Sequence, residues 1–279
     1  MVSQISKVSF PEPSFDYITN VYEPSLKKYL NNNNYLRWQD AQNAIEKGRK
    51  ILEFDEEVDT YIAFYGAHHY YKLIEAFEAL DISRFNSGQL EIFSYGCGAA
   101  TATCSLISYC RERQINLPFQ SLTLIEPSQI SLDRGVEYIE RALFPEELDR
   151  IDIRKTYKLI GQLKNNDLAS NSPAVKLHLF SNILDLKEIN LESLASLIRK
   201  TQFGTNYFVC INPKNYESII RINNFYDNLS NFFQLSNISI NDKDIPGKKI
   251  WMMKYNQYSY SRLRRYHRIF QANPIQYDI

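Results

Sequence analysis

The feature that most restricts the fold of this chain is an alternation of strand-like and helical segments that begins at Leu90. Short apolar runs rich in β-branched and aromatic residues recur, and amphipathic helical stretches lie between most of them. The strand-like runs are LEIFSY (90–95), SLTLIEP (121–127), IDIRKTYKLI (151–160), VKLHLFSNIL (175–184), TNYFVCINP (205–213), FQLSNISIN (233–241) and KKIWMMKY (248–255). Repeated strand–helix units require right-handed crossovers and a parallel sheet covered by helices on both faces.

We therefore predict an α/β fold with a doubly wound, mostly parallel sheet of seven strands. No helix separates 233–241 from 248–255, so we expect these last two strands to be antiparallel. Residues 1–88 have apolar residues at helical spacing and are expected to form an N-terminal helical cap. The predicted organisation is a cap (1–88), a sheet domain (89–257) and a basic, aromatic C-terminal tail (258–279).

The composition excludes several classes of protein. Lys plus Arg and Asp plus Glu both number 32, so no net charge attracts nucleic acid or an anionic membrane, and such binding needs a local patch. No apolar run approaches the roughly 18–20 residues that span a bilayer, and the start of the chain does not resemble a secretion signal. We expect a cytoplasmic protein whose four cysteines are buried, reduced thiols rather than a zinc or disulfide framework.

The turn after the first strand is the first candidate site. The chain has only 9 glycines, yet two of them, Gly96 and Gly98, bracket Cys97 between a strand and a helix. In a doubly wound sheet this loop lies closest to a ligand, because ligands bind beyond the carboxyl ends of the strands. Glycines let the backbone approach a ligand, and the N–H groups of the next helix point to the same place. The alternative is a tight turn with a purely structural role.

The second candidate is Glu126, at the end of the second strand. A carboxylate there can accept hydrogen bonds from the 2′- and 3′-hydroxyls of a ribose. The order of glycine loop, helix, strand and acid is the arrangement that binds a nucleoside. A nicotinamide cofactor fits less well because the glycine spacing differs, and no lysine of a phosphate-binding loop follows the turn.

With these motifs, residues 90–257 resemble the class I (Rossmann-like) S-adenosyl-L-methionine-dependent methyltransferases. Their first motif is similar to D-x-G-C-G-x-G, where this chain has Ser94-Tyr95-Gly96-Cys97-Gly98-Ala99-Ala100, and their second strand typically ends in an acid, as at Glu126. The resemblance implies that S-adenosyl-L-methionine is the cofactor. It implies contacts to the cofactor from Ser94, Tyr95, Gly96, Cys97, Gly98, Ala100, Glu126 and Pro127. Ser94 replaces the acid of that motif, which removes a charge, and Ala100 replaces its third glycine.

Candidate catalytic residues follow the strand at 175–181. Asn182 and Asp185 are expected to border the transferred methyl group or its acceptor, with helix capping as the alternative role. His178, within the strand, is expected to be a core histidine. Asn212, followed by Pro213, faintly resembles the N-P-P-Y motif of amino-methylating enzymes and is a candidate substrate contact.

The cap and the tail supply the remaining candidates. Tyr65 and His69, from the stretch YGAHHYYKL (65–73), are predicted to line a substrate pocket, with aromatic packing as the alternative. Adjacent histidines point about 100° apart on a helix, so we expect no metal site there. Arg262, Arg264, Arg265 and Arg268 are interleaved with aromatic residues and are candidate contacts for nucleic acid or another anionic partner. The alternative is a solvated helix face that docks through its aromatic residues.

Two functions remain open. The first is a methyltransferase that uses S-adenosylmethionine on an unidentified acceptor. The second is a non-catalytic adaptor, or nucleoside-binding module, that keeps the fold and acts through protein or nucleic-acid contacts. Ser94 favours the adaptor, whereas Glu126 favours the enzyme.

Overall fold

The computed structural model describes residues 15–32, 37–85, 89–116, 118–170 and 174–275. Residues 1–14 and 86–88 of the predicted cap, and residues 276–279 of the predicted tail, lie outside the described residues. The helices are α1 (Glu23–Asn32), α2 (Trp38–Ala44), α3 (Asp55–Tyr61), α4 (Ala67–Leu80), α5 (Thr101–Glu112), α6 (Gln129–Ala142), α7 (Pro145–Leu148), α8 (Leu191–Thr201) and α9 (Tyr216–Ser230). The strands are β1 (Leu90–Tyr95), β2 (Phe119–Ile125), β3 (Asp152–Thr156), β4 (Val175–Ser181), β5 (Asn206–Asn212), β6 (Phe233–Asn241), β7 (Ile245–Met252), β8 (Gln257–Leu263) and β9 (Tyr266–Pro274).

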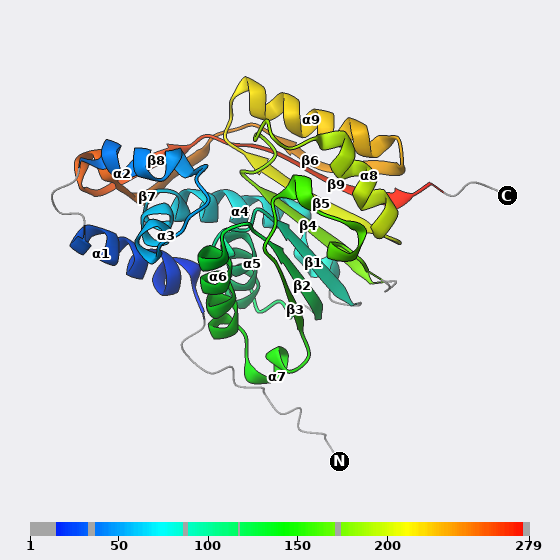
Figure 1. Ribbon diagram of the computed structural model, residues 1–279, viewed down its shortest axis with the longest axis horizontal. Coiled ribbons are helices and arrows are strands. Elements are labelled where there is room, and N and C mark those ends of the chain that lie inside the picture. Colours follow the sequence, from blue (N-terminus) through cyan, green and yellow to red (C-terminus); the bar gives the residue numbers. More distant parts are fainter. Residues whose placement is uncertain (1–14, 33–36, 86–88, 117, 171–173, 276–279) are drawn as a thin grey trace, which may run out of the picture.

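Seven strands form one sheet in the order β3-β2-β1-β4-β5-β9-β6, and β7 and β8 form a separate hairpin (Figure 1). Strands β1 to β5 run parallel to one another, whereas β9 is antiparallel to both β5 and β6. The predicted fold class is confirmed: this is a doubly wound sheet of seven strands in which only β9 runs antiparallel to the other strands.

The identity of the antiparallel strand was predicted wrongly. The run 248–255 falls in β7 and pairs with β8, and it does not join the main sheet. The strand that lies beside β6 is β9. It belongs to the segment that we expected to form a basic tail beyond the sheet. Most residues of β9 are buried, including Ile269 and Phe270, whereas β7 buries only Ile245 and Ile250. Strand β9 buries apolar side chains against both of its neighbours in the sheet, and this burial is the physical reason for its pairing with β5 and β6.

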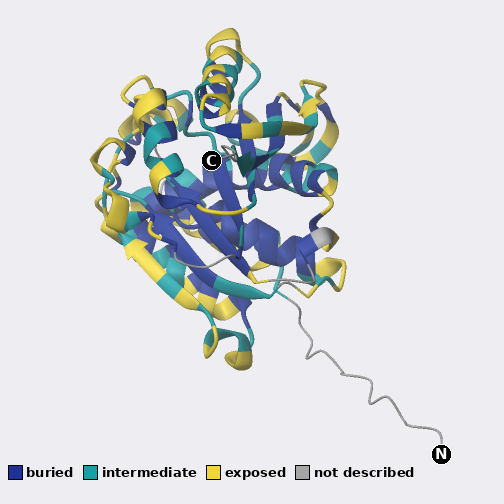
Figure 2. Cartoon of the chain, turned by 90° about the vertical axis from the view of Figure 1, so that its right-hand side faces the viewer, coloured by how far each residue is buried: buried dark blue, intermediate teal, exposed yellow. Residues whose placement is uncertain are grey.

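Helices cover both faces of the sheet (Figure 1). On one face, α4 and α5 pack together and α6 packs on α5, over a core that includes Ile92, Leu124 and Leu179. On the other face, α8 and α9 pack together over aromatic residues such as Phe180 and Phe208. The strands are mostly buried between these layers, and exposed residues lie mainly on outer helices and loops (Figure 2).

The N-terminal helices are joined to the sheet domain by direct contacts. Helix α4 packs on β5, β6 and β9 as well as on α5, so it serves as a covering helix of the sheet. A π-helical turn (Ile62–Gly66) joins α3 directly to α4. Asp59 of α3 accepts a hydrogen bond from Arg134 of α6 at 2.8 Å. The rest of the cap is thereby held against α5 and α6, near the tips of β1 and β2.

Candidate functional site

The turn after β1 has a left-handed backbone at three positions. Gly96, Gly98 and Ala100 have φ values of +58°, +53° and +56°. Glycine takes such values freely, whereas an alanine there costs roughly 1–2 kcal/mol. The Cys97 N–H donates to the carbonyl oxygen of Ile125 at 3.0 Å and fixes the turn to the end of β2. The sequence prediction of a tight turn between the first two strand ends is therefore confirmed.

The two glycines of this turn have different neighbours. A Cβ placed on Gly96 would lie 2.5 Å from Cδ1 and 2.7 Å from Cγ1 of Ile183, in the segment after β4. A Cβ placed on Gly98 would meet no heavy atom of the described residues within 4 Å. Gly96 is thus required by a neighbouring part of the protein, whereas the space beside Gly98 is open to a ligand.

Glu126, directly after β2, is hydrogen-bonded to this turn. Its Oε2 accepts a hydrogen bond from the Gly98 N–H at 3.0 Å, and its Oε1 accepts one from the Ser128 N–H at 3.0 Å. The side chain is only partly exposed, and burial raises its pKa although both N–H donors act to lower it. Each carboxylate oxygen keeps a second lone pair for another donor. The next residue, Pro127, is also partly exposed at this edge.

Helix α6 packs closely on the glycine turn. A Cβ on Gly135 would lie 2.8 Å from the backbone nitrogen of Ala100, so only glycine fits at this point of α6. The Ser128 hydroxyl accepts a hydrogen bond from the Ser131 N–H and so caps α6, and it donates to the carbonyl oxygen of Leu52 in the cap. One serine thus links the Glu126 strand end, α6 and the cap.

Beside the turn lies a small cavity. It has a volume of ≈ 20 Å³ and is bounded by Tyr61 and His69 of the cap, by residues of the turn including Ser94, and by Ser181 of β4. A cavity of this size holds about one water molecule. Tyr95 also borders it, but the Tyr95 side chain lies in the aromatic core on the other face, with its hydroxyl 3.1 Å from Nδ1 of His178. His178 is a fully buried core histidine, as expected.

Two of the cap residues expected to line a pocket behave differently. His69 borders the cavity, whereas Tyr65 does not; the two rings stack with centroids 6.0 Å apart. The Tyr65 hydroxyl accepts a hydrogen bond from Gln42 at 3.2 Å. Burial lowers the pKa of His69 well below its ordinary value, so this ring is neutral near pH 7. Tyr65 and His69 belong to one aromatic cluster, and of these two only His69 borders the cavity.

Tyr61 belongs to the same cluster and was not among the candidates. It lies four residues before Tyr65 and eight before His69, on the same helical face. Burial raises its pKa, and the nearby charges of Glu126 and Asp185 act in the same direction. Tyr61 therefore lies close to both predicted acids. The helical spacing of Tyr61, Tyr65 and His69 is the sequence signal that could have identified it.

Asn182 and Asp185 lie in the segment that follows β4. Asn182 has φ +56°, and its N–H donates to the carbonyl oxygen of Ile211 at 2.7 Å. The Oδ1 atoms of Asn182 and Asp185 are buried and have no hydrogen-bond partner among the described residues. Neither residue caps the following helix, since Asn190 accepts the capping hydrogen bond from the Ser193 N–H. Two unpaired acceptors at a strand end are available to a ligand donor.

The environment of Asp185 includes a buried lysine of the cap. Burial lowers the pKa of Lys72 to about 8, and the charge of Asp185 partly offsets this effect. Asn212 lies at the end of β5 and is fully buried. In the amide orientation that satisfies both of its polar atoms, it accepts from the Asp185 N–H at 3.1 Å and donates to the Ile211 carbonyl oxygen. Asn212 therefore positions the segment after β4 from within the protein.

The four arginines of the predicted tail separate into two pairs. Arg265 is buried and lies 3.8 Å from the carboxylate of Glu75. Arg268 lies over the ring of Tyr226 at 3.3 Å and donates to Asn223 and Asn237. Arg262 and Arg264 are exposed. The structure thus does not bring the four arginines together as one surface.

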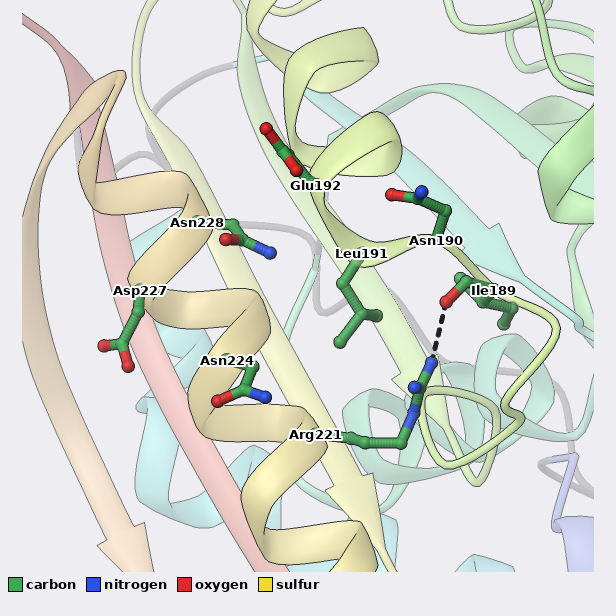
Figure 3. A pocket seen from close by; sticks show the side chains of 8 residues that line it. All are labelled: Ile189, Asn190, Leu191, Glu192, Arg221, Asn224, Asp227 and Asn228. Carbon is green, nitrogen blue, oxygen red and sulfur yellow. Dashed lines mark hydrogen bonds between the residues drawn. The ribbon is translucent and has the colours of Figure 1, made fainter.

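A larger groove, of ≈ 320 Å³, lies between α8 and α9, away from the glycine turn (Figure 3). Arg221 is its one basic side chain, and it donates hydrogen bonds to the carbonyl oxygens of Leu184, Leu186 and Ile189. These bonds hold the segment after β4 in place. The groove is lined largely by amide and acidic side chains, and its arginine has a structural role.

The described ranges hold neither a disulfide bond nor a group of side chains suited to a metal ion. All four cysteines are buried and free of disulfide bonds. No group of three or more His, Cys, Asp or Glu in the described ranges could hold a metal ion. None of the helices within these ranges is both long and apolar enough to cross a membrane.

Comparison with known proteins gives fold-level similarities. No family model matches the chain, and no curated protein matches it. Solved structures that are similar include a S-adenosylmethionine-dependent methyltransferase from Leishmania major (12% identity, 89% of this chain and 90% of that chain, TM-score 0.41). Another is a methyltransferase of Methanococcus maripaludis that is described as dependent on S-adenosylmethionine (13% identity, 87% and 95%, TM-score 0.43). A third is a small RNA methyltransferase (11% identity, 75% and 27%, TM-score 0.45). Similarities of this degree assign neither a substrate nor an active-site residue to the chain.

Proposed function

We propose that this chain is a methyltransferase that uses S-adenosylmethionine, whose nucleoside lies across the tips of β1 and β2. The observation that supports this most is the position of Glu126. Its carboxylate is fixed by the N–H groups of Gly98 and Ser128, and Gly98 is the glycine of the turn whose Cβ position is open. A carboxylate fixed in this way has free lone pairs for the two hydroxyls of a ribose.

The fit of the cofactor differs between its two halves. The nucleoside fits the edge formed by Gly98, Glu126 and Pro127. The methionine half does not fit beside Ser94, because the cavity there is ≈ 20 Å³. We infer that Tyr61 and His69 move away from the turn when the cofactor binds. Ser94, being neutral, contributes no attraction for the cationic sulfonium.

S-adenosylmethionine, when bound, supplies an electrophilic methyl group. The chain's own contribution is orientation of the reactants and exclusion of water. The unpaired Oδ1 atoms of Asn182 and Asp185, in the segment after β4, would accept hydrogen bonds from the acceptor or the cofactor. Tyr61 and His69 would exclude water from the site once the cap closes over it. A cytoplasmic location is part of the proposal, because four free thiols suit a reducing compartment.

A second candidate function is a non-catalytic adaptor that keeps the fold. The ≈ 20 Å³ cavity and the neutral Ser94 favour it, since both weaken the case for a bound sulfonium. The adaptor differs from the enzyme in one measurable property: it need not bind S-adenosylmethionine.

Calorimetric titration with S-adenosylhomocysteine distinguishes the two functions. The proposal predicts micromolar binding by the wild type and a loss of about 10- to 100-fold in Glu126→Ala, because charge-assisted hydrogen bonds are lost. Glu137→Ala, which changes an exposed acid of α6, is the matched control and should bind like the wild type. Absence of binding to the wild type at millimolar ligand would favour the adaptor instead.

A further inference from the structure

The β7–β8 hairpin leaves the main sheet at the edge that carries the candidate site. It connects the end of β6 to the start of β9, where Asn241 pairs with His267 and Tyr266 pairs with Asn212 at the end of β5. Because β5 is parallel to β1 and β2, this is also the edge of Gly98 and Glu126. The hairpin lies at the same end of the molecule as α1 and α3 (Figure 1).

One face of the hairpin packs on the protein. Ile245, Ile250 and Leu263 are buried, and Lys248 lies over the ring of Tyr71 in α4 at 5.5 Å. In strands, side chains alternate between faces, so the residues between these point outward. The hairpin is thereby fixed in orientation by its apolar face. On its other face Trp251 packs edge-on against the Tyr258 ring, whereas Lys249, Tyr260 and Arg262 are exposed.

The outward face combines aromatic rings with positive charge. Along β8, Tyr258, Tyr260 and Arg262 share this face, with 42% and 76% of the two tyrosines exposed. Across the hairpin, Lys249 pairs with Tyr260, and its ammonium lies 5.8 Å from the ring centre of Tyr258. We call Lys249, Tyr258, Tyr260 and Arg262, together with the exposed Arg264 that follows, the hairpin face.

The charge of this region contrasts with that of the whole chain. The chain is neutral overall, but no acidic residue lies between Asp244 and Asp278. Among the ion pairs of the described residues, none involves Lys249, Arg262 or Arg264. The positive charges of the hairpin face are therefore not neutralised internally, unlike those of Arg265 and Arg268.

We infer that the hairpin face is a docking surface for single-stranded nucleic acid. Lysine and arginine neutralise phosphates, and exposed tyrosine rings stack on unpaired bases. A duplex is not favoured, because stacking on Tyr258 and Tyr260 requires bases that are free of their partners. The inference does not depend on cofactor binding, since no residue of the hairpin face belongs to the glycine turn or contacts Glu126.

The test is fluorescence anisotropy of a labelled 15-nucleotide oligouridine and the matching oligodeoxythymidine, without cofactor. The wild type should bind at least one of them. Tyr260→Ala should weaken binding by about 5- to 100-fold through lost stacking. Arg262→Ala with Arg264→Ala should weaken binding and lower the slope of log affinity against log salt by about one to two.

The matched control removes an exposed basic residue and an exposed tyrosine from α8 and α9, away from the hairpin. Lys200→Ala with Tyr216→Ala removes an exposed lysine of α8 and a tyrosine of α9 that is 82% exposed, and binding should not change. No binding by the wild type, or equal losses in the control, would overturn the inference. The inference would also be overturned if the arginine variant lost oligonucleotide binding and Tyr260→Ala did not, because that result indicates general anion binding. Titration of the hairpin variants with S-adenosylhomocysteine measures cofactor binding alone. Failure of the docking inference can therefore be distinguished from failure of the proposed function.

Discussion

The carboxylate of Glu126 at the end of β2 accepts a hydrogen bond from the backbone N–H of Gly98 at 3.0 Å. This bond joins the acid to the one glycine of the turn whose Cβ position is open. The two residues that the sequence indicates as ligand contacts are therefore adjacent, although they are separated by helix α5. Their proximity follows from the parallel pairing of β1 and β2.

The two glycines of the turn should respond differently to alanine. Gly96→Ala places a methyl group against Ile183, so we expect a loss of about 2–4 kcal/mol in the free energy of unfolding from overpacking and strain. Gly98→Ala meets no neighbour and should cost only about 1–2 kcal/mol, but it should weaken binding of S-adenosylhomocysteine. Urea unfolding and calorimetry of both variants check this. Equal losses of stability in the two variants, together with unchanged binding of S-adenosylhomocysteine, would contradict the conclusion that the space beside Gly98 is open to a ligand.

Gly135 of α6 provides a test of the helix packing behind the site. Gly135→Ala would place its Cβ 2.8 Å from the Ala100 nitrogen, and backbone cannot move aside as a side chain can. We expect a loss of about 1–3 kcal/mol in the free energy of unfolding. Gly161→Ala is the matched control, since no heavy atom of the described residues lies within 4 Å of its Cβ position. A Gly135→Ala variant as stable as the control would show that α6 does not pack as described.

The free energy of unfolding should decrease as the pH is lowered, because His178 is buried in its neutral form. Burial lowers the pKa of His178 to about 3, whereas the unfolded chain has a value near 6.5. Between these values the unfolded state binds a proton that the native state does not, so stability is complete above about pH 6.5 and decreases as pH falls. The decrease approaches about 1.4 kcal/mol per pH unit for this one group.

Urea unfolding at pH 7.5 and pH 5.0 measures this effect against His178→Gln. The glutamine can keep hydrogen bonds to the Tyr95 hydroxyl and Asn206 but does not titrate. The decrease in stability between the two pH values should be about 2 kcal/mol smaller in the variant. Other histidines with a lowered pKa, such as the half-buried His68, titrate in both proteins and cancel in the comparison. An identical decrease in both proteins would exclude His178 as the cause.

Much of the fold could be predicted because its signals are local. The strand and helix periods, the glycine turn and the acid at Glu126 are each contained in a short stretch of sequence. The role of β9 could not be predicted in this way, since its arginines suggested solvent exposure. Arg268 is accommodated in the sheet by Tyr226 and Asn223 of α9, which are distant in sequence.

The parts of the site that were missed depend on long-range packing. Ile183 follows β4 and contacts Gly96 only because β1 and β4 pair in the sheet. Tyr61 reaches the cavity because α3 and α6 are joined through Asp59 and Arg134. The spacing of Tyr61 from Tyr65 and His69 could have indicated a shared helical face, but neither the contact of that face with the glycine turn nor the position of Ile183 is visible in the local sequence.

The most direct test of the central claim is whether Glu126 recognises the ribose hydroxyls of a bound nucleoside. Calorimetry would compare S-adenosylhomocysteine with its 2′,3′-dideoxy analogue on the wild type and on Glu126→Gln. We expect the wild type to prefer the natural ligand by about 30-fold or more, and the variant to reduce that preference to a few-fold. Failure of the wild type to bind either ligand, or the same preference in both proteins, would contradict the account.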